Sequence, residues 1–207
     1  GGSFADYPTD GSTPGDLATT TVEGQEVPYI VRIERGTINR AVYEFAVIRE
    51  PSEPELTPWT AGDGWNGKLA YTFGGACGVG YWQGTSTGGV ENDLLLSRGY
   101  AVASGTFNVY AQNCNDVTSA ETATMVKEHV VESLGPLEYT IGYGGSAGTM
   151  QQLLLSNNYP GIIDGVLGEI GYPDERSTTV AGHDCRNLLN YWSSDEGAGW
   201  SDAEKLA

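Results

Sequence analysis

The pattern of apolar and polar residues near the start of the chain predicts two antiparallel strands. Residues 27–35 and 39–49 alternate between apolar and polar side chains, which is typical of a strand with one buried face. Gly36 and Thr37 lie between the two runs and are expected to form the turn of a hairpin. A loop rich in Pro, Trp and Gly follows over residues 51–66.

Strands and helices alternate along the rest of the chain. The pattern predicts strands at residues 68–73, 100–107 and 137–143, a further buried strand within 159–168, and helices at 91–98, 118–134 and 147–157. Thr118 and Glu121 have the spacing of a capping box, and Gly135 with Pro136 ends that helix. This order predicts an α/β fold with a doubly wound, mostly parallel sheet, to which the N-terminal hairpin adds an antiparallel edge.

The segment 141–149, IGYGGSAGT, carries the clearest chemical signal. It places Ser146 between Gly144 and Gly148 in a GxSxG frame, directly after a predicted strand and directly before a predicted helix. In α/β-hydrolases this arrangement is the nucleophile elbow, in which glycines leave room for a strained turn that exposes the serine. The bare frame also occurs as an ordinary glycine-rich turn, so the flanking strand and helix are what favour a nucleophile.

Longer segments of the chain carry a family resemblance. They are VPYIVRIERGTINRAVY from Val27, FGGACGVGYWQGT from Phe73, LLSRGYAV from Leu95, NCNDVTSAETATMVKEH from Asn113, and GGSAGTMQQ from Gly144 followed by YPGIIDG. Together they resemble an uncharacterised family of secreted bacterial α/β-hydrolases, more distantly similar to tannases and feruloyl esterases and to hydrolases of hydroxyalkanoate oligomers. The resemblance implies an α/β-hydrolase fold that this chain contains in part, with a flexible lead-in at residues 1–21, the N-terminal part of the hydrolase domain at 22–171, and the start of a cap or lid at 172–207.

Acyl transfer needs hydrogen-bond donors for the oxyanion as well as a nucleophile. In the resembled fold one donor is the amide after the serine, here Ala147, and a second comes from the loop after the third strand. Phe73-Gly74-Gly75-Ala76 occupies that place and is similar to an HGGG loop, so the amide of Gly75 or of Ala76 is expected to be the second donor. A tight glycine turn without any ligand is the alternative.

Neither histidine has the sequence position expected of the catalytic general base. His129 falls within the predicted helix 118–134 beside charged residues, so we interpret it as a solvated helix position. His183 follows the serine too closely for the usual order of nucleophile, acid and late histidine. We therefore expect a C-terminal fragment of the same hydrolase to supply Asp or Glu and His from a second polypeptide; a compact triad of His183 with Asp174 or Asp184 is the alternative.

Three cysteines add to this interpretation. Cys77 and Cys114 each follow the end of a strand that is adjacent to the other in the α/β-hydrolase order, so a disulfide between them is geometrically plausible and would brace the oxyanion loop. Cys185 is left over, which points to a partner elsewhere. Three buried free thiols are the alternative, and a metal site from His183, Asp184 and Cys185 is disfavoured because adjacent residues rarely face one ion.

Aromatic residues at strand ends have two interpretations. Tyr81 and Trp82 follow the predicted oxyanion loop, and Tyr172 follows the last predicted strand, at the edge where α/β sheets bind ligands. They either form an acyl or aromatic-ester pocket or only cover the sheet.

Charge and hydropathy exclude several classes of function. The chain has 10 Lys and Arg against 27 Asp and Glu, a net charge of −17, which disfavours binding to nucleic acid or anionic membranes. This charge reflects either solubility or adaptation to high salt. No apolar run is long enough to span a membrane, and we expect any secretion signal to have been removed from a secreted or extracytoplasmic protein.

The expected function is hydrolysis of carboxylic esters, including polyesters or oligoesters, through an acyl-enzyme on Ser146 without a metal or other cofactor. Ester is preferred only because the resembled groups are mostly esterases. An amidase or peptidase, and a non-catalytic α/β-hydrolase-like binding protein, remain the alternatives.

Overall fold

The computed structural model describes residues 4–60, 62–78, 80–172 and 175–205. The chain divides into two compact units, Gly1–Gly171 and Tyr172–Ala207, and each is described by itself.

A six-stranded sheet forms the centre of the first unit. Its strands are β3 (Val31–Ile38), β4 (Ala41–Ile48), β5 (Lys68–Thr72), β6 (Ala101–Gly105), β7 (Tyr139–Gly145) and β8 (Gly165–Glu169), in the spatial order β3-β4-β6-β5-β7-β8. β6, β5, β7 and β8 are parallel, whereas β3 and β4 pair antiparallel and β4 joins β6 antiparallel. The expected α/β fold with a mostly parallel sheet and an antiparallel N-terminal hairpin is therefore present.

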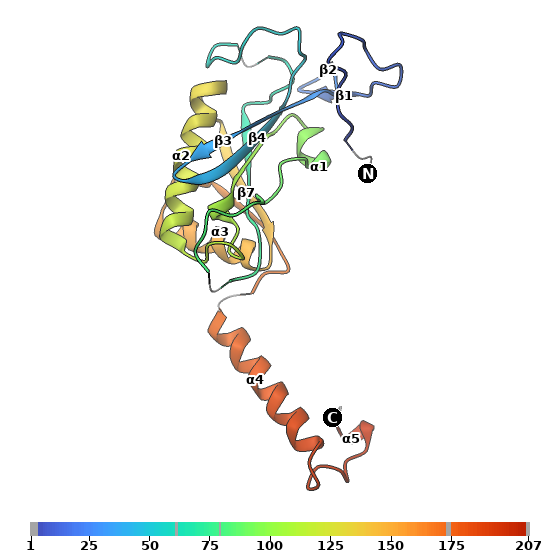
Figure 1. Ribbon diagram of the computed structural model, residues 1–207, viewed down its shortest axis with the longest axis vertical. Coiled ribbons are helices and arrows are strands. Elements are labelled where there is room, and N and C mark those ends of the chain that lie inside the picture. Colours follow the sequence, from blue (N-terminus) through green and yellow to red (C-terminus); the bar gives the residue numbers. More distant parts are fainter. Residues whose placement is uncertain (1–3, 61, 79, 173–174, 206–207) are drawn as a thin grey trace. The chain divides into compact units, whose positions relative to one another are not determined.

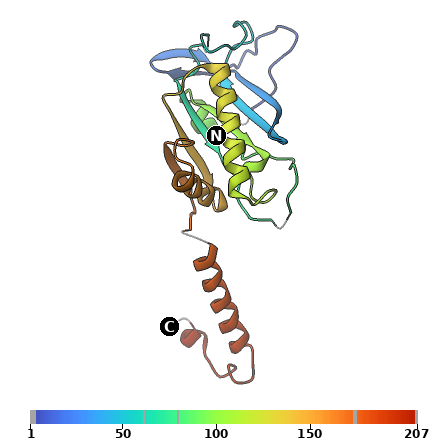
Figure 2. The same cartoon turned by 90° about the vertical axis from the view of Figure 1, so that its left-hand side faces the viewer.

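Helices cover both faces of this sheet (Figure 1). α2 (Asp116–Leu134) and α3 (Ala147–Asn158) pack on the face that carries Phe45, Leu69 and Tyr71, and α2 lies in front of the strands in Figure 2. The short α1 (Asp93–Leu96) packs on the opposite face, against Ala70 and Val102. Because successive strand residues point to opposite faces, β5 contributes Leu69 and Tyr71 to one core and Ala70 to the other.

One hairpin turn differs from the predicted one, and one hairpin was not predicted. The β3–β4 turn lies at Asn39-Arg40 rather than at Gly36-Thr37, because Ile38 pairs with Ala41 and leaves these two residues as the loop. Both have a positive φ, of 53° and 66°, as in a favoured type of two-residue hairpin turn. Gly36 instead lies within β3, where a Cβ would come 2.6 Å from the ring of Tyr43. A further hairpin pairs β1 (Thr19–Val22) with β2 (Gln25–Pro28), so the predicted lead-in of residues 1–21 already contains the start of a strand.

Helix boundaries also differ from those that the sequence predicts. Asn115 caps α2, and its side-chain oxygen accepts from the amide of Thr118 at 2.9 Å. The capping box predicted from Thr118 and Glu121 is therefore wrong, because the asparagine three residues earlier satisfies the free amide first. A one-turn 3₁₀ helix, Thr106–Asn108, follows β6 where the sequence predicts a continuing strand.

The second unit contains α4 (Glu175–Trp192) and α5 (Asp202–Lys205). Four apolar side chains of α4 are exposed: Val180, Leu188, Leu189 and Tyr191. Within the part of the chain that the structure describes, no helix is long and apolar enough to cross a membrane.

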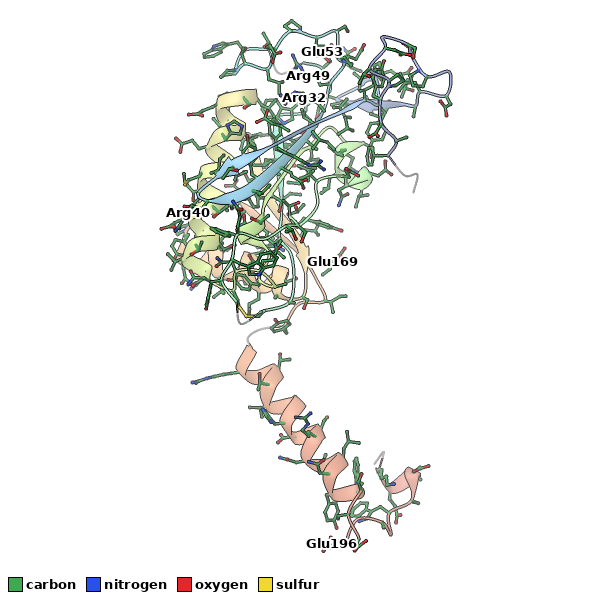
Figure 3. All side chains as sticks on the ribbon, viewed as in Figure 1. Arg32, Arg40, Arg49, Glu53, Glu169 and Glu196 are labelled. Atoms are coloured by element: carbon green, nitrogen blue, oxygen red, sulfur yellow. A yellow bond between two sulfur atoms is a disulfide. The ribbon has the colours of Figure 1, made fainter. Side chains whose placement is uncertain are left out.

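Arg49, at the end of β4, holds the long loop that precedes β5 (Figure 3). Its guanidinium is buried, donates to the carbonyl oxygens of Thr60 at 3.0 Å and of Pro54, and lies 3.3 Å from the carboxylate of Glu53. A charge withdrawn from water in this way needs such partners.

Glu34 on β3 links the antiparallel hairpin to α2. Its Oε1 accepts from the hydroxyl of Tyr43 at 2.7 Å and lies 2.6 Å from Nε2 of His129, while Arg32 donates to Oε2 at 2.9 Å. Burial alone would raise the pKa of Glu34, but the hydrogen bonds from His129, Tyr43 and Arg32 outweigh it and lower the pKa. His129 is thus partly buried and bonded to Glu34 and Tyr43, not a solvated helix position.

We predict that Glu34 makes the stability of the first unit sensitive to acid. Because its folded pKa lies below its unfolded value, its contribution is complete above the unfolded pKa, about 4.3, and is lost as the pH falls through the folded pKa. The drop in melting temperature from about pH 7 to about pH 3 should be smaller in Glu34→Gln than in the wild type. Glu121→Gln, at an exposed position, is the control; equal drops in all three proteins contradict the assignment.

Candidate active site

Ser146 lies at the carboxyl end of β7, immediately before α3. Its backbone has φ 56° and ψ −124°, an unfavourable conformation for any residue with a Cβ. The residue is exposed to solvent. The strand, sharp turn and helix that the sequence predicts around the GxSxG frame are therefore present, and the turn presents the serine at the edge where parallel strands end.

The two glycines of the frame make room for a neighbouring carbonyl group. A Cβ on Gly144 would lie 2.3 Å from the carbonyl oxygen of Phe73, and a Cβ on Gly148 would lie 2.5 Å from the same atom. Gly144 also has a positive φ of 152°. No side chain fits at either position, which explains why glycine flanks the serine on both sides.

Hydrogen bonds from the end of β8 hold the strained turn. The amide of Ser146 donates to the carbonyl oxygen of Glu169 at 2.9 Å. The hydroxyl of Thr149 is within bonding distance of that same oxygen, at 3.0 Å, and of the carbonyl oxygen of Gly144, at 2.9 Å. β7, β8 and the first turn of α3 are thus tied together around the serine.

The glycine loop after β5 lies against this turn. A Cβ placed on Gly75 would lie 3.5 Å from Cβ of Ser146 and 3.9 Å from the amide nitrogen of Ala147. Among the described residues, the amides of Gly75, Ala76 and Ala147 donate to no protein acceptor. The structure therefore brings Gly75, Ser146 and Ala147 together, with Ala76 next along the loop at a positive φ of 59°.

A disulfide braces the same loop. Cys77 and Cys114 are joined, with their Cα atoms 5.3 Å apart, in the pairing that the sequence analysis expects. Between the strand ends and the disulfide, backbone hydrogen bonds also join the two loops: the amide of Gly74 donates to Asn108, and the amide of Ala111 donates to Gly75. Cys185 is a free, exposed thiol on α4.

The aromatic residues considered for a substrate pocket are open to solvent. Tyr81 is 68% and Trp82 is 50% exposed, and they lie beside the loop after β6, where Tyr81 pairs with Asn113. Tyr172 belongs to the second unit. Two cavities of the first unit, with volumes of about 660 and 340 Å³, are lined by other residues. Tyr81 and Trp82 thus line neither of these two cavities.

The two histidines lie in different parts of the structure. His129 contacts Glu34 and Tyr43 in the link between α2 and the hairpin. His183 and Asp184 lie on α4 in the second unit, and Asp174 falls outside the described residues. The first unit thus places a strained turn and the neighbouring backbone amides around Ser146, whereas its single histidine, His129, is bonded to Glu34 and Tyr43.

Sequence reasoning missed a set of buried polar side chains beneath the site. Asn108, Ser119, Gln151 and Gln152 are each completely buried. Gln152 donates to the carbonyl oxygens of Gly144 and Gly148, both at 3.1 Å. The available signal was the pair of glutamines one turn after the serine, on a helix face where apolar residues are expected.

The whole chain, residues 1–207, matches the family described as "Tannase-like family of unknown function (DUF6351)". The chain therefore belongs to this tannase-like family, in agreement with the resemblance drawn from its sequence. No curated protein matches it.

We predict that Gly148→Ala destabilises the protein, because its Cβ would overlap the carbonyl oxygen of Phe73. Overpacking of this kind costs about 1–3 kcal/mol, measurable as the free energy of unfolding in denaturant. Gly15→Ala is the control, since a Cβ there meets nothing within 4 Å. If both variants unfold at the wild-type denaturant concentration, the close approach is not what requires glycine.

Proposed function

We propose that this chain carries the nucleophile and the oxyanion donors of a serine hydrolase that cleaves carboxylic esters. The observation that supports this most is Ser146 itself: an exposed hydroxyl on a strained turn, beside Gly75 and Ala147, whose amides have no acceptor among the described residues. Strain at a surface serine is costly, and it persists where a function requires it.

The proposed reaction is acyl transfer in two steps. Oγ of Ser146 forms a bond to the ester carbonyl carbon and gives its proton to a histidine, which passes it to the departing alcohol as the C–O bond breaks. Water then attacks the acyl-enzyme, the histidine takes a proton from water, and Ser146 regains a proton as the carboxylic acid leaves. In both steps the negative oxygen accepts hydrogen bonds from Ala147 and the glycine loop.

Membership of a tannase-like family supports an ester rather than an amide as the substrate. We propose that the aromatic pair Tyr81 and Trp82 contacts the substrate. We also propose that residues 172–207 are the start of a cap or lid. The exposed apolar residues of α4 support this role, because such a face is stable only when it is covered.

The histidine and its acidic partner come, in this proposal, from a second polypeptide of the same hydrolase that docks on β8. β8 is the last strand in the sheet order, and Val166, Leu167 and Ile170 at this edge are 41%, 46% and 89% exposed. An uncovered apolar edge strand readily accepts another strand. Because the end of β8 contacts Ser146, a strand added beside it ends near the serine.

An extracytoplasmic location accompanies this function. The disulfide between Cys77 and Cys114 is of the kind that persists in an oxidising compartment.

A fluorophosphonate probe tests the nucleophile directly. We predict that the natural protein is labelled at Ser146, as located by peptide mass spectrometry, and that Ser146→Ala abolishes both labelling and ester hydrolysis. Ser156→Ala, on the exposed side of the same helix, should retain both. Absence of labelling in the wild type, with the fold intact, supports a non-catalytic binding protein instead.

The second polypeptide is tested by the mass of the active species. Native mass spectrometry of the purified esterase should show a complex larger than the 22.0 kDa of this chain. Val166→Asp places a charge on the edge of β8, so it should dissociate the partner and abolish the esterase activity. Val117→Asp, at a similarly exposed position on α2, should change neither the complex nor the activity. Full activity from a single 22 kDa species refutes the proposal.

A further inference from the structure

A continuous chain of buried hydrogen bonds runs beneath the candidate active site. The hydroxyl of Tyr71 donates to Oδ1 of Asn108 at 2.7 Å, and Nδ2 of Asn108 donates to Oγ of Ser119 at 3.0 Å. Ser119 donates to Oε1 of Gln151 at 2.9 Å, and Nε2 of Gln151 donates to the carbonyl oxygen of Gly74 at 2.8 Å. The four side chains are at most 1% exposed.

The direction of this chain is fixed by chemistry. Because Ser119 donates its only hydroxyl proton to Gln151, the amide oxygen of Gln151 faces Ser119 and its NH₂ group must face Gly74. A reversed amide would leave two acceptors opposed in the core, which is unfavourable for buried groups. Gln151 is therefore held as a donor to one backbone carbonyl of the glycine loop.

That carbonyl belongs to the peptide whose other end is the amide of Gly75. A trans peptide is planar, and its C=O and N–H point in opposite directions. With the oxygen of Gly74 drawn toward the buried Gln151, the N–H of Gly75 must point away from the core. Gly75 lies against Ser146 and Ala147, so its N–H is turned to the exposed side on which the serine lies.

We infer that Gln151 is a positioning residue, which sets the orientation of the Gly74–Gly75 peptide and makes the Gly75 amide the second oxyanion donor. This inference rests on the proposed hydrolase function and selects Gly75 over Ala76. The peptide that includes the Ala76 amide is held instead from the neighbouring loop, through the bond from Ala111 to the carbonyl oxygen of Gly75.

Without Gln151, the oxygen of Gly74 keeps, among the described residues, the longer bond from the amide of Tyr110, at 3.4 Å. The peptide is then free to rotate, and a donor that is wrongly aimed stabilises the transition state poorly. The loss should fall on kcat rather than on KM, because the oxyanion forms only along the reaction path.

Gln151→Met is the test variant, and Gln152→Met is its matched control. Both residues are fully buried glutamines on α3, but Gln152 bonds to Gly144, Gly148 and Leu167 and not to the glycine loop. The first readout does not depend on activity: in ¹⁵N-labelled protein, the Gly75 amide resonance should shift in Gln151→Met and stay near its wild-type position in Gln152→Met.

The second readout compares an oxygen ester with its thionoester, whose sulfur accepts hydrogen bonds poorly. Gln151→Met should lower kcat for the oxygen ester by about 10- to 100-fold, since complete loss of one donor costs roughly 100- to 1000-fold, and should change the thionoester rate much less. Gln152→Met should alter both substrates alike. A general loss of structure would also affect both alike, so the ratio separates positioning from instability.

Each outcome decides the inference. If the Gly75 resonance and the substrate ratio are both unchanged in Gln151→Met, Gln151 does not position this peptide. Should that variant fail to fold, Ser119→Ala keeps Gln151 but frees its amide to rotate, and the same changes are expected in smaller size; their absence there overturns the inference. A wild type without labelling or esterase activity refutes the hydrolase proposal, while the resonance still reports on the peptide.

Discussion

The close approach of the Phe73 carbonyl group to the two glycines around Ser146 is the constraint on which this site depends. β5 and β7 are adjacent parallel strands, and the amide of Phe73 donates to the carbonyl oxygen of Tyr143 at 2.9 Å. The carbonyl group of Phe73, directly after β5, then fills the space that side chains at Gly144 and Gly148 would occupy. Because α3 begins directly against this strand end, the serine turn and the glycine loop meet.

A strained serine needs neighbours that hold it. Backbone conformations such as that of Ser146 cost on the order of 1–3 kcal/mol, while individual hydrogen bonds contribute about 0.5–1.5 kcal/mol each. Those of the Ser146 amide and of Thr149 to the end of β8 are of the right size to offset this cost. On the other side, the Cys77–Cys114 disulfide and the buried side chains below Gly74 restrict the loop that carries the amide donors.

The sequence predicted those features that depend on local pattern, and it failed where a partner distant in sequence decides. Ser146 and the glycine loop carry motifs, so their placement on a turn and beside it could be predicted. The hairpin turn at Asn39-Arg40 was missed because Gly36 has a stronger turn signal. In the structure, Gly36 is required instead because a side chain there would overlap the ring of Tyr43. His129 was read from its helix neighbours alone, whereas Glu34, 95 positions away, determines its contacts. Gln151 was overlooked because only folding brings it to Gly74 and Ser119.

A crystal structure of the protein after reaction with a phosphonate ester measures the central claim most directly. The account predicts a phosphorus atom bonded to Oγ of Ser146 and one phosphoryl oxygen within about 2.7–3.1 Å of the amide nitrogens of Gly75 and Ala147. An adduct whose phosphoryl oxygen faces solvent, or contacts neither amide, would contradict the claim that this turn and this loop together form the site.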